Sequence, residues 1–557
     1  MLLMALTSFV LVLPALIMGD AINGDIPVHV RWQAQFAELV WSGTPYPRWL
    51  PDMNQGFGSP AFFFYPPLIQ WLGALFQPLL PGSGHAASRL VLAVWVISAA
   101  GGVGCWRWLC ALRLAPHSAI FGGLVFLLMP YRCFVDVYQR GALAELAGMC
   151  VMPWLLCFAT GMKAGRPGAW GGYALATGVM FYSHLPAALM GILFATGYVL
   201  VLAGRRNGRF VLRAAAATVV GIMIGALCIA TALGLLHLIT DTTAMWGPRN
   251  QPMNWLLFSS VRWDDTMHAM TLAMIVMALV VGTLLAVPAL GTQDPQARRV
   301  VLFLVLAILV VIFLNTAPSR PFWALQTPLS RIQFPFRLLS IHVVALSGLA
   351  AIAHHRFASA AGRRAALRAR LLWLGVPGLL LLDASLLAIQ NYRNRDERPP
   401  TNQQMIASNV DSSEYVPGQM AAVSARFGAA SSYALSGSAT SRPLVWNARE
   451  IALAVDAATP SRLALRQFAF TGWQCRVDGG PWQGAATIPY PLNVAACAVP
   501  AGRHLLEARM PATWIERAGG LLTLGGLILA LTSLAGAWRS SRTSRKDAAR
   551  PPGRALP

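Results

Sequence analysis

Long apolar stretches recur along the whole chain and are separated by short polar connections. A membrane-spanning helix needs about 20 mostly apolar residues. The pattern predicts about twelve such helices, at 1–18, 88–104, 118–130, 142–160, 171–183, 186–203, 214–238, 267–290, 300–315, 338–353, 371–389 and 516–538. Only 11% of the 557 residues are charged, against about 25% in soluble domains. We therefore predict a polytopic α-helical membrane protein.

The net charge of +22 is concentrated in alternate connections. Loops 105–117, 161–170, 204–213, 291–299 and 354–370, with the tail 539–557, hold 21 of the 43 basic and two of the 21 acidic residues. Because short cytoplasmic loops collect Lys and Arg, both termini are predicted in the cytoplasm. Segments 19–87, 241–266, 317–337 and 391–515 are then extracytoplasmic. A nucleic-acid protein would gather its basic residues on one folded face, so no nucleic-acid partner is expected.

The first apolar segment has a second interpretation, as a cleavable signal peptide. No Lys or Arg precedes its apolar run, as a typical signal would require. Cleavage would leave the later topology unchanged.

The first external segment, 19–87, is predicted to be ordered. Residues 29–42 place apolar positions at helical spacing, which is typical of a short amphipathic helix on the membrane surface. The run TPYPRWLPDMNQGFGSPAFFFYPPL follows. Its prolines exclude a regular helix or central strand, and its aromatic content argues against disorder. We expect a loop packed on the outer membrane face.

Beyond residue 390 the composition becomes polar and rich in turn residues. Short alternating runs at 451–456, 462–469, 473–478 and 503–509 predict strands of a small β-sandwich. The expected organisation is therefore a transmembrane domain at 1–390, an extracytoplasmic β-rich domain at 391–515, a last transmembrane helix at 516–538 and a basic cytoplasmic tail at 539–557.

Cys475 and Cys497 fall in two of the predicted external strands. In an oxidising compartment they are candidates for a disulfide, with two free thiols as the alternative. The sequence contains no CxxC or HExxH metal spacing and no glycine-rich phosphate loop.

Ionisable residues gather at the predicted outer ends of the spans, where charge is costly unless it is paired or used. Acids beside arginines suit a site that ionises a hydroxyl and binds phosphate. The residues are Asp25, His29, Arg48, Asp52, Asp136, Arg140, Glu145, His184, Arg331 and Arg337.

Structural roles are the alternative for these residues. Asp25 and His29 are four apart and fit the cap of a helix N-terminus. Arg140 and Glu145 fit an ion pair that closes a span, and Arg331 and Arg337 fit side chains that reach the lipid head groups. His184, among apolar residues, also fits a buried histidine with satisfied hydrogen bonds.

Several motifs together resemble a family of bacterial and archaeal multispanning proteins. They are GDIPVHV, YPRWLPDMNQGFGSPAFFFYPPL, YQRGALAEL, QFPFRLL and SSEYVPG. These proteins are described as membrane proteins related by name to 6-pyruvoyl-tetrahydropterin synthase. The family is similar to the GT-C superfamily of membrane glycosyltransferases, which includes the YfhO-like proteins, and FAFTGWQCRVDGG resembles the outer β domain of those relatives.

The resemblance implies a GT-C-like fold in a bacterial inner membrane. It also implies inverting transfer of a sugar from a polyprenyl-phosphate donor to an envelope glycan or glycolipid acceptor. The bilayer, the donor and the acceptor are the expected partners. The resemblance implies no particular cofactor, and a divalent metal stays open as an alternative.

On this interpretation Asp25 is the catalytic base, because an inverting transfer needs one carboxylate to take the acceptor proton. Arginines stabilise the leaving phosphate. The expected substrate-binding residues are His29, Arg48, Asp52, Asn54, Tyr65, Asp136, Arg140, Glu145, His184, Arg331 and Arg337.

Two other functions remain as alternatives. A transporter or flippase of lipid-linked saccharides would need polar residues deep within its spans and often internal repeats. The ionisable residues lie mainly at the span ends and no clear repeat is present, which favours the enzyme. A non-catalytic scaffold for envelope assembly is the second alternative.

Overall fold

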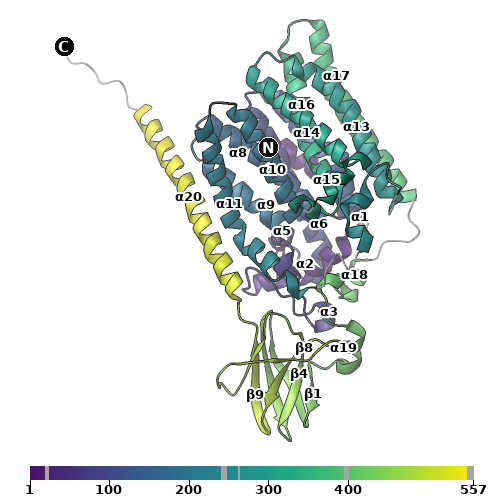
Figure 1. Ribbon diagram of the computed structural model, residues 1–557, viewed down its shortest axis with the longest axis vertical. Helices are drawn as coiled ribbons and strands as arrows, with labels where there is room; N and C mark the ends of the chain where they lie inside the picture. The colour runs from purple at the N-terminus through teal and green to yellow at the C-terminus, as the bar shows by residue number, and fades with distance from the viewer. Residues whose placement is uncertain (19–23, 240–246, 261–263, 326, 394–400, 549–557) are drawn as a thin grey trace, which may run out of the picture.

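A computed structural model describes residues 1–18, 24–239, 247–260, 264–325, 327–393 and 401–548. Parts of the predicted external segments 19–87, 241–266 and 391–515 lie outside these residues, as does the end of the predicted tail. The side chains of the tail also lie outside the description. The chain forms a helical bundle with a β-sheet region attached to one end (Figure 1).

Each of the twelve predicted apolar segments forms a helix. Ten spans in the described part of the chain are long and apolar enough to cross a membrane. One of them is α7 together with the π-helix η2 (Tyr131–Gln139) that follows it, whereas α1 and α9 are shorter helices. The twelve are α1 (Leu2–Met18), α6 (Ala86–Ala111), α7 (Pro116–Leu128), α8 (Leu143–Lys163), α9 (Ala169–Ser183), α10 (Leu185–Ala203), α11 (Gly208–Gly234), α13 (Asp265–Leu290), α14 (Pro295–Leu314), α16 (Leu339–Ser359), α17 (Arg363–Arg393) and α20 (Trp514–Ala548). The chain is therefore a multi-pass membrane protein.

Small residues allow these helices to pack closely. A Cβ on Gly178 of α9 would lie 2.3 Å from the side chain of Ile224 on α11, and one on Gly221 would lie 2.3 Å from Thr177. Membrane helices often pack through small residues, which let their backbones approach closely. Van der Waals contacts then drive association, because the hydrophobic effect does not act between helices in lipid. Helix α20 lies against α9 and α11 in the same way (Figure 1).

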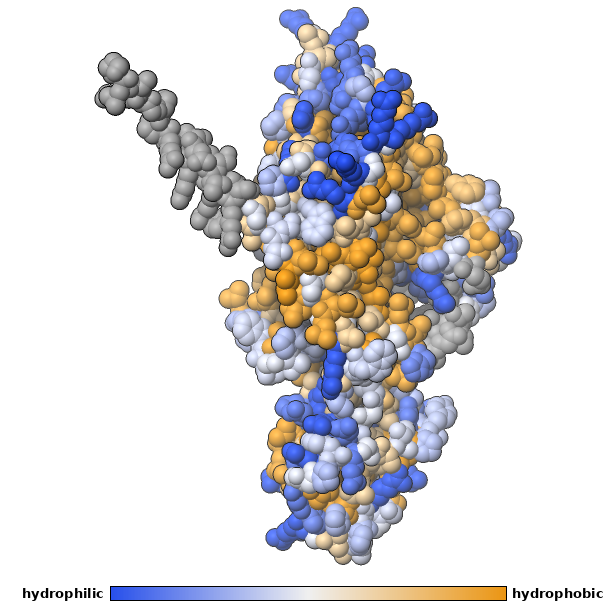
Figure 2. Space-filling view, turned by 60° about the vertical axis from the view of Figure 1, so that its left-hand side comes forward, coloured by the Kyte–Doolittle hydropathy of each residue, from blue (hydrophilic) through white to orange (hydrophobic). Residues whose placement is uncertain are grey.

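The surface is divided into three zones along the long axis. On the face that Figure 2 shows, an apolar band crosses the bundle, and hydrophilic side chains gather above it and on the β region below it. The turn between α16 and α17, which belongs to a predicted cytoplasmic loop, lies at the end opposite the β region (Figure 1). The first external segment lies at the same end of the bundle as the β region.

The first external segment folds into short helices, two of which lie in the proline-rich run for which the sequence predicts an ordered loop. They are α2 (Ile26–Trp41), α3 (Met53–Gly56), α4 (Ala61–Phe64) and α5 (Leu68–Ala74). Helix α2 packs on α5, α6 and α18 (Asn402–Ser408). Aromatic residues of this segment form one core with the β region, in which Trp49 donates to Gln467 (Nε1 to Oε1, 2.6 Å) and Phe468 N donates to Phe57 O (2.7 Å).

Nine strands form the two sheets of the C-terminal region. The sheet orders are β1-β4-β8-β7 and β2-β3-β9-β5-β6. The strands are β1 (Ser432–Ser436), β2 (Ala439–Trp446), β3 (Glu450–Ala457), β4 (Ser461–Phe468), β5 (Gln474–Val477), β6 (Gln483–Gly484), β7 (Ala486–Thr487), β8 (Val494–Val499) and β9 (Gly502–Arg509). The four predicted strands correspond to β3, β4, β5 and β9. A disulfide between Cys475 on β5 and Cys497 on β8 joins the two sheets.

The segment between α17 and the first strand belongs to neither sheet. It contains α18, the turn η9 (Ser413–Tyr415) and α19 (Met420–Phe427). Residues of this segment pack on α2 and α3 through hydrogen bonds from Arg31 to Ser408 (2.8 Å) and from Asn409 to the carbonyl of Asp52. The polar region after α17 therefore begins with a connector that covers the first external segment.

We predict that the β region is extracytoplasmic. Leu444 on β2 and Leu367 on α17 are both exposed, so Leu444→Cys should react with a membrane-impermeant maleimide in intact cells. Leu367→Cys should react only after permeabilisation. The protein without either substitution is the control, because it shows how strongly the native thiols are labelled. Labelling of Leu367→Cys alone in intact cells would reverse the orientation.

Candidate active site

A cavity of about 850 Å³ opens at the end of the bundle that faces the β region. Its walls come from segments far apart in the sequence. They are the start of α2, Tyr65 after α4, residues 251–253 of η5 (Pro252–Trp255) and its approach, Trp323 and Ala324, five residues between Ser330 and Arg337 around η7 (Pro328–Ile332) and η8 (Pro335–Leu338), and Ser412, Glu414 and Tyr415 of the connector. Of the residues predicted for the site, Asp25, His29, Tyr65, Arg331 and Arg337 line this cavity.

The backbone at Asp25 is held against the loop before α8. Asp25 N donates to Arg140 O (2.8 Å). Gly24 has φ +67°, and a Cβ there would lie 1.9 Å from the same carbonyl oxygen. Only glycine fits this contact, because any side chain would separate the two backbones. The Gly-Asp pair therefore sets the position at which α2 begins.

The Asp25 side chain does not cap α2. The helix begins at Ile26, and the Asp25 carbonyl oxygen accepts from the amides of Val28 and His29 (3.1 Å each). The carboxylate makes no capping hydrogen bond, and it lines the cavity. The geometry thus departs from the structural alternative, in which a cap would occupy this carboxylate.

Two opposing effects act on the Asp25 carboxyl. Its side chain is reachable from the cavity, yet protein surrounds it closely enough to remove much of its hydration, which raises its pKa above the usual value. The positive charges of Arg140 and Arg337 oppose this effect. The result is a more basic carboxylate than one on an open surface.

Glu145 is the centre of an ion cluster beneath the cavity. Its carboxylate pairs with Arg140 (Oε2 to Nη1, 3.0 Å) and Arg337 (Oε2 to Nε, 3.2 Å), and accepts from Tyr131 OH (2.6 Å). Arg140 Nη1 also pairs with Asp136 (2.8 Å), on the π-helix η2 (Tyr131–Gln139). Glu145 and Asp136 are buried, so this cluster balances charges that water does not reach.

Asp136, Arg140 and Glu145 therefore lie together, as the interpretation of an ion pair predicts, but they do not line the cavity. Arg337 belongs to both places, because it pairs with Glu145 and also lines the cavity. Its Nη1 donates to Ile332 O (2.8 Å), and its guanidinium lies 4.7 Å from the ring centroid of Phe334. Arg331 is exposed on the same wall. The contacts of Arg337 with Glu145, Ile332 and Phe334 hold its guanidinium in one orientation.

His29 is held by neutral partners. Gln70 Nε2 donates to His29 Nδ1 (3.0 Å), and Tyr65 OH lies 3.4 Å from Nε2. Burial lowers the pKa of His29 to about 4, so the ring is neutral at pH 7. His29 thus binds Gln70 and Tyr65 rather than orienting Asp25.

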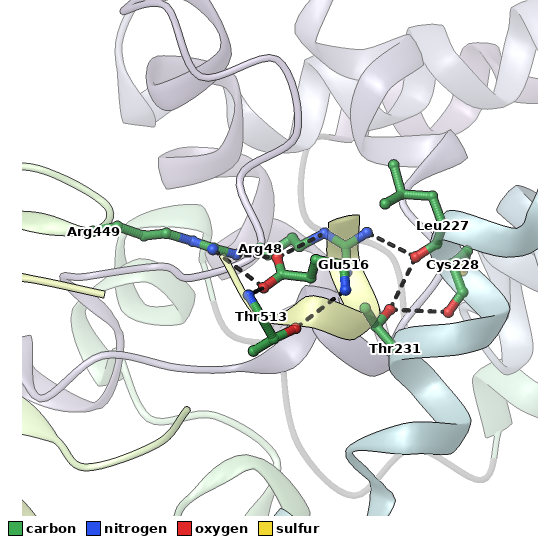
Figure 3. A network of polar contacts seen from close by, with 7 residues as sticks. All are labelled: Arg48, Leu227, Cys228, Thr231, Arg449, Thr513 and Glu516. Carbon is green, nitrogen blue, oxygen red and sulfur yellow. Dashed lines mark hydrogen bonds and ion pairs between the residues drawn. The ribbon is translucent and has the colours of Figure 1, made fainter. Parts of the chain in front are cut away.

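The remaining predicted residues lie outside the cavity. Arg48 is buried where the first external segment meets α11 and α20 (Figure 3). It donates to Leu227 O (Nη2, 2.8 Å) and lies 3.6 Å from Glu516, which also pairs with Arg449 (2.7 Å). This network joins three parts of the fold and does not reach the cavity.

Asp52, Asn54 and His184 make structural contacts away from the cavity lining. Asp52 is exposed beside α3. Asn54, at φ +55°, donates to Gly58 O (2.9 Å) and accepts from Asp411 N (2.8 Å). His184 caps α10, where its Nδ1 accepts from Ala187 N (3.3 Å).

The connector contributes residues that the sequence analysis did not select. Ser412, Glu414 and Tyr415 line the cavity opposite the membrane helices. Asp411 beside them is buried and accepts from Trp32 Nε1 (3.0 Å) and Ser59 Oγ. The motif SSEYVPG, which supported the family resemblance, covers this stretch and was the available signal.

The described residues contain no group of three or more His, Cys, Asp or Glu side chains that could hold a metal ion. The acids nearest the cavity are Asp25 and Glu414, which supply too few ligands for a protein cage. The donor set that the described residues supply therefore does not fit a bound metal.

No family model and no curated protein matches this chain. Two solved structures resemble it weakly. The arabinofuranosyltransferase AftD from Mycobacteria has a TM-score of 0.42 at 16% identity, over 68% of this chain and 27% of that protein. ArnT from Cupriavidus metallidurans, bound to undecaprenyl phosphate, has a TM-score of 0.42 at 15% identity, over 75% of each chain. This chain thus spans about a quarter of the length of AftD, and TM-scores below 0.5 decide nothing about its activity.

We predict that Glu145→Gln destabilises the protein. The substitution keeps the size of the side chain but leaves Arg140 and Arg337 short of one negative charge in a buried place. Breaking a buried ion pair costs about 3–5 kcal/mol, so thermal melting in detergent should show a clear decrease in Tm. Glu38→Gln is the control, because Glu38 is exposed on α2. Equal melting of both variants would contradict the central role of Glu145.

Proposed function

We propose that the protein is a membrane glycosyltransferase of the GT-C type. It transfers a sugar from a polyprenyl-phosphate donor to an extracytoplasmic envelope acceptor, with inversion at the sugar. The observation that carries this proposal is the Asp25 carboxylate, which lines a large cavity without serving as a helix cap, while Arg331 and Arg337 line the same cavity.

The cavity has the size and chemistry that the reaction needs. Its volume of about 850 Å³ lies in the range of small-molecule sites, roughly 300–1,000 Å³. An inverting transfer places a base on the side of the sugar opposite the leaving group. Asp25 takes the proton of the acceptor hydroxyl as its oxygen attacks the anomeric carbon, and the bond to the phosphate oxygen breaks.

Arg331 and Arg337 stabilise the phosphate that leaves. A polyprenyl phosphate departs as an anion, so fixed positive charge replaces a general acid. Arg337 is pre-oriented by Glu145 and the Ile332 carbonyl, which avoids reorganisation during the reaction. Arg331 is exposed and reaches the same wall from η7.

Arg140 has a different role from the one expected for it. Its guanidinium is taken by Asp136 and Glu145, and its carbonyl oxygen accepts from Asp25 N. It therefore acts as a positioning residue, which sets the place of Asp25 and supplies part of the field that keeps its carboxylate ionised.

Replacement of the proposed base tests this function. Asp25→Asn keeps the shape of the side chain but removes the base, so turnover should decrease by about a hundredfold or more. In cells that lack the protein, one envelope glycan should lose a sugar and the carrier lipid bearing that sugar should accumulate. Mass spectrometry of glycans and carrier lipids measures both. Wild type should restore the glycan, and Asp25→Asn should not.

Asp264→Asn is the matched control. The Asp264 side chain caps the outer end of α13 by accepting from Met267 N (2.9 Å), and Asn caps nearly as well as Asp. This variant should restore the glycan fully. If Asp25→Asn restores it equally well at the same level of folded protein, Asp25 is not the base. An unchanged glycan and carrier-lipid profile in cells without the protein would reject glycosyl transfer.

The acidity of Asp25 predicts the pH dependence. A base acts only when ionised, so a raised pKa moves the acidic limb of kcat/KM to a pH above that of an ordinary Asp, about 3.9. Burial also raises the pKa of Asp411, to about 6, so Asp411→Asn is the control. The acidic decrease in kcat/KM should still be present in Asp411→Asn. It should be absent from the residual activity of Asp25→Asn. A wild-type limb at or below about pH 4 would contradict the raised pKa of Asp25.

A further inference from the structure

Part of the cavity lining comes from the C-terminal half of the chain, far from Asp25 in the sequence. Ser412, Glu414 and Tyr415 come from the connector between α17 and the β region, and they line the cavity together with Asp25. Glu414 accepts from Ser412 Oγ (Oε2, 2.5 Å). Glu414 also lies close enough to Asp25 for its negative charge to raise the pKa of Asp25. Two carboxylates thus face one space.

Asp411 holds this part of the lining in place. Its buried carboxylate accepts from Trp32 Nε1 (3.0 Å) and from Ser59 Oγ, and its amide donates to Asn54 Oδ1 (2.8 Å). Partners on α2, α3 and the loop between α3 and α4 therefore fix the connector just before Glu414. Ser412 N also donates to Asp411 Oδ1 (2.8 Å). The position of Glu414 is consequently set by the first external segment.

Both signs of charge line the cavity. Arg331 and Arg337 are its basic residues, and Asp25 and Glu414 are its acidic residues in the described part of the chain. A phosphate group is repelled by a carboxylate, so it binds at the arginines. The space beside Glu414 suits hydrogen-bond donors instead, because an ionised carboxylate only accepts.

Three aromatic rings also line the cavity. Trp32 lies 4.7 Å from Tyr65 and 6.1 Å from Tyr415, measured between ring centroids, and all three residues line the cavity. Rings with an apolar face and a polar tip suit a ligand that has both CH groups and hydroxyls. A sugar ring has this character. A simple lipid alcohol or a serine side chain has one hydroxyl, so it would give Glu414 no hydrogen bond once that hydroxyl faces Asp25.

We propose that Glu414 is a substrate-binding residue that holds a second hydroxyl of the acceptor while Asp25 faces the attacking one. The acceptor is therefore a saccharide with neighbouring hydroxyl groups. Asp411 is the positioning residue for Glu414. This inference rests on the proposed glycosyl transfer and adds the class of the acceptor and the residue that selects it.

Kinetics of the purified full-length protein test the proposal. The probes are the carrier-lipid fraction that accumulates in cells lacking the protein, as donor, and the envelope glycan from the same cells, as acceptor. Glu414→Gln keeps shape and removes charge. It should raise the KM for the glycan by about tenfold or more, since hydrogen bonds to charged groups contribute about 1.5–3 kcal/mol. The KM for the donor should stay unchanged.

Glu450→Gln on β3 is the matched control and should behave as wild type, because Glu450 is exposed on the β region. Asp411→Asn should also raise the acceptor KM alone, since it loosens the connector's part of the lining without removing a substrate contact. A merely structural role of Asp411 would lower the amount of active protein and leave both KM values unchanged.

Two results would overturn the inference. One is an acceptor KM of Glu414→Gln within twofold of wild type, and the other is an equal rise in both KM values, which would place Glu414 at the donor. If Glu414→Gln does not fold, Glu414→Asp decides by the same criteria, because it keeps the charge and shortens its reach. A wild-type protein that moves no sugar between the two fractions would reject the proposed function itself.

Discussion

The burial of Glu145 between two arginines is the constraint on which the cavity depends. An unpaired guanidinium at the outer end of a membrane helix would be drawn toward water or lipid head groups. Glu145 instead holds Arg140 and Arg337 at the base of the cavity, with Tyr131 and Asp136 completing the cluster. Because the Arg140 carbonyl also holds Asp25 N, the ion cluster and the proposed base form one unit.

The first external segment links the membrane helices to the rest of the outer structure. Its aromatic residues share a core with the β region, and Arg48 joins it to α11 and α20 through the Leu227 carbonyl and Glu516. A buried charge without a partner destabilises the fold. The network of Arg48 and Glu516 therefore favours one arrangement of the first external segment, α11 and α20. The segment thus serves as a rigid base on which the connector carrying Glu414 is placed.

The candidate site was only partly predictable from single residues. The rule that charge at a span end is paired or used selected Asp25, His29, Arg331 and Arg337, which do line the cavity, as does Tyr65. The same rule also selected Arg48, Asp52 and His184, which lie elsewhere: Arg48 and His184 make structural contacts through their side chains, and Asp52 makes them through its backbone. A local pattern shows that a polar group needs a partner. It does not show whether that partner is a substrate or another part of the chain.

The sequence by itself determined the twelve apolar helical segments, the alternation of basic connections and the existence of a C-terminal β region. These features follow from hydrophobic length, charge and local alternation, which act over a few residues or one span. Only the tertiary structure decided that Glu414 lines the same cavity as Asp25, nearly 400 residues away in the chain, and that Arg48 lies outside this cavity. Contacts between residues so far apart in the chain depend on how whole helices and loops pack. That packing is set by many apolar contacts and a few buried hydrogen bonds together. Asp411 illustrates this, since its neighbours in the chain give no indication that Trp32 and Ser59 are its partners.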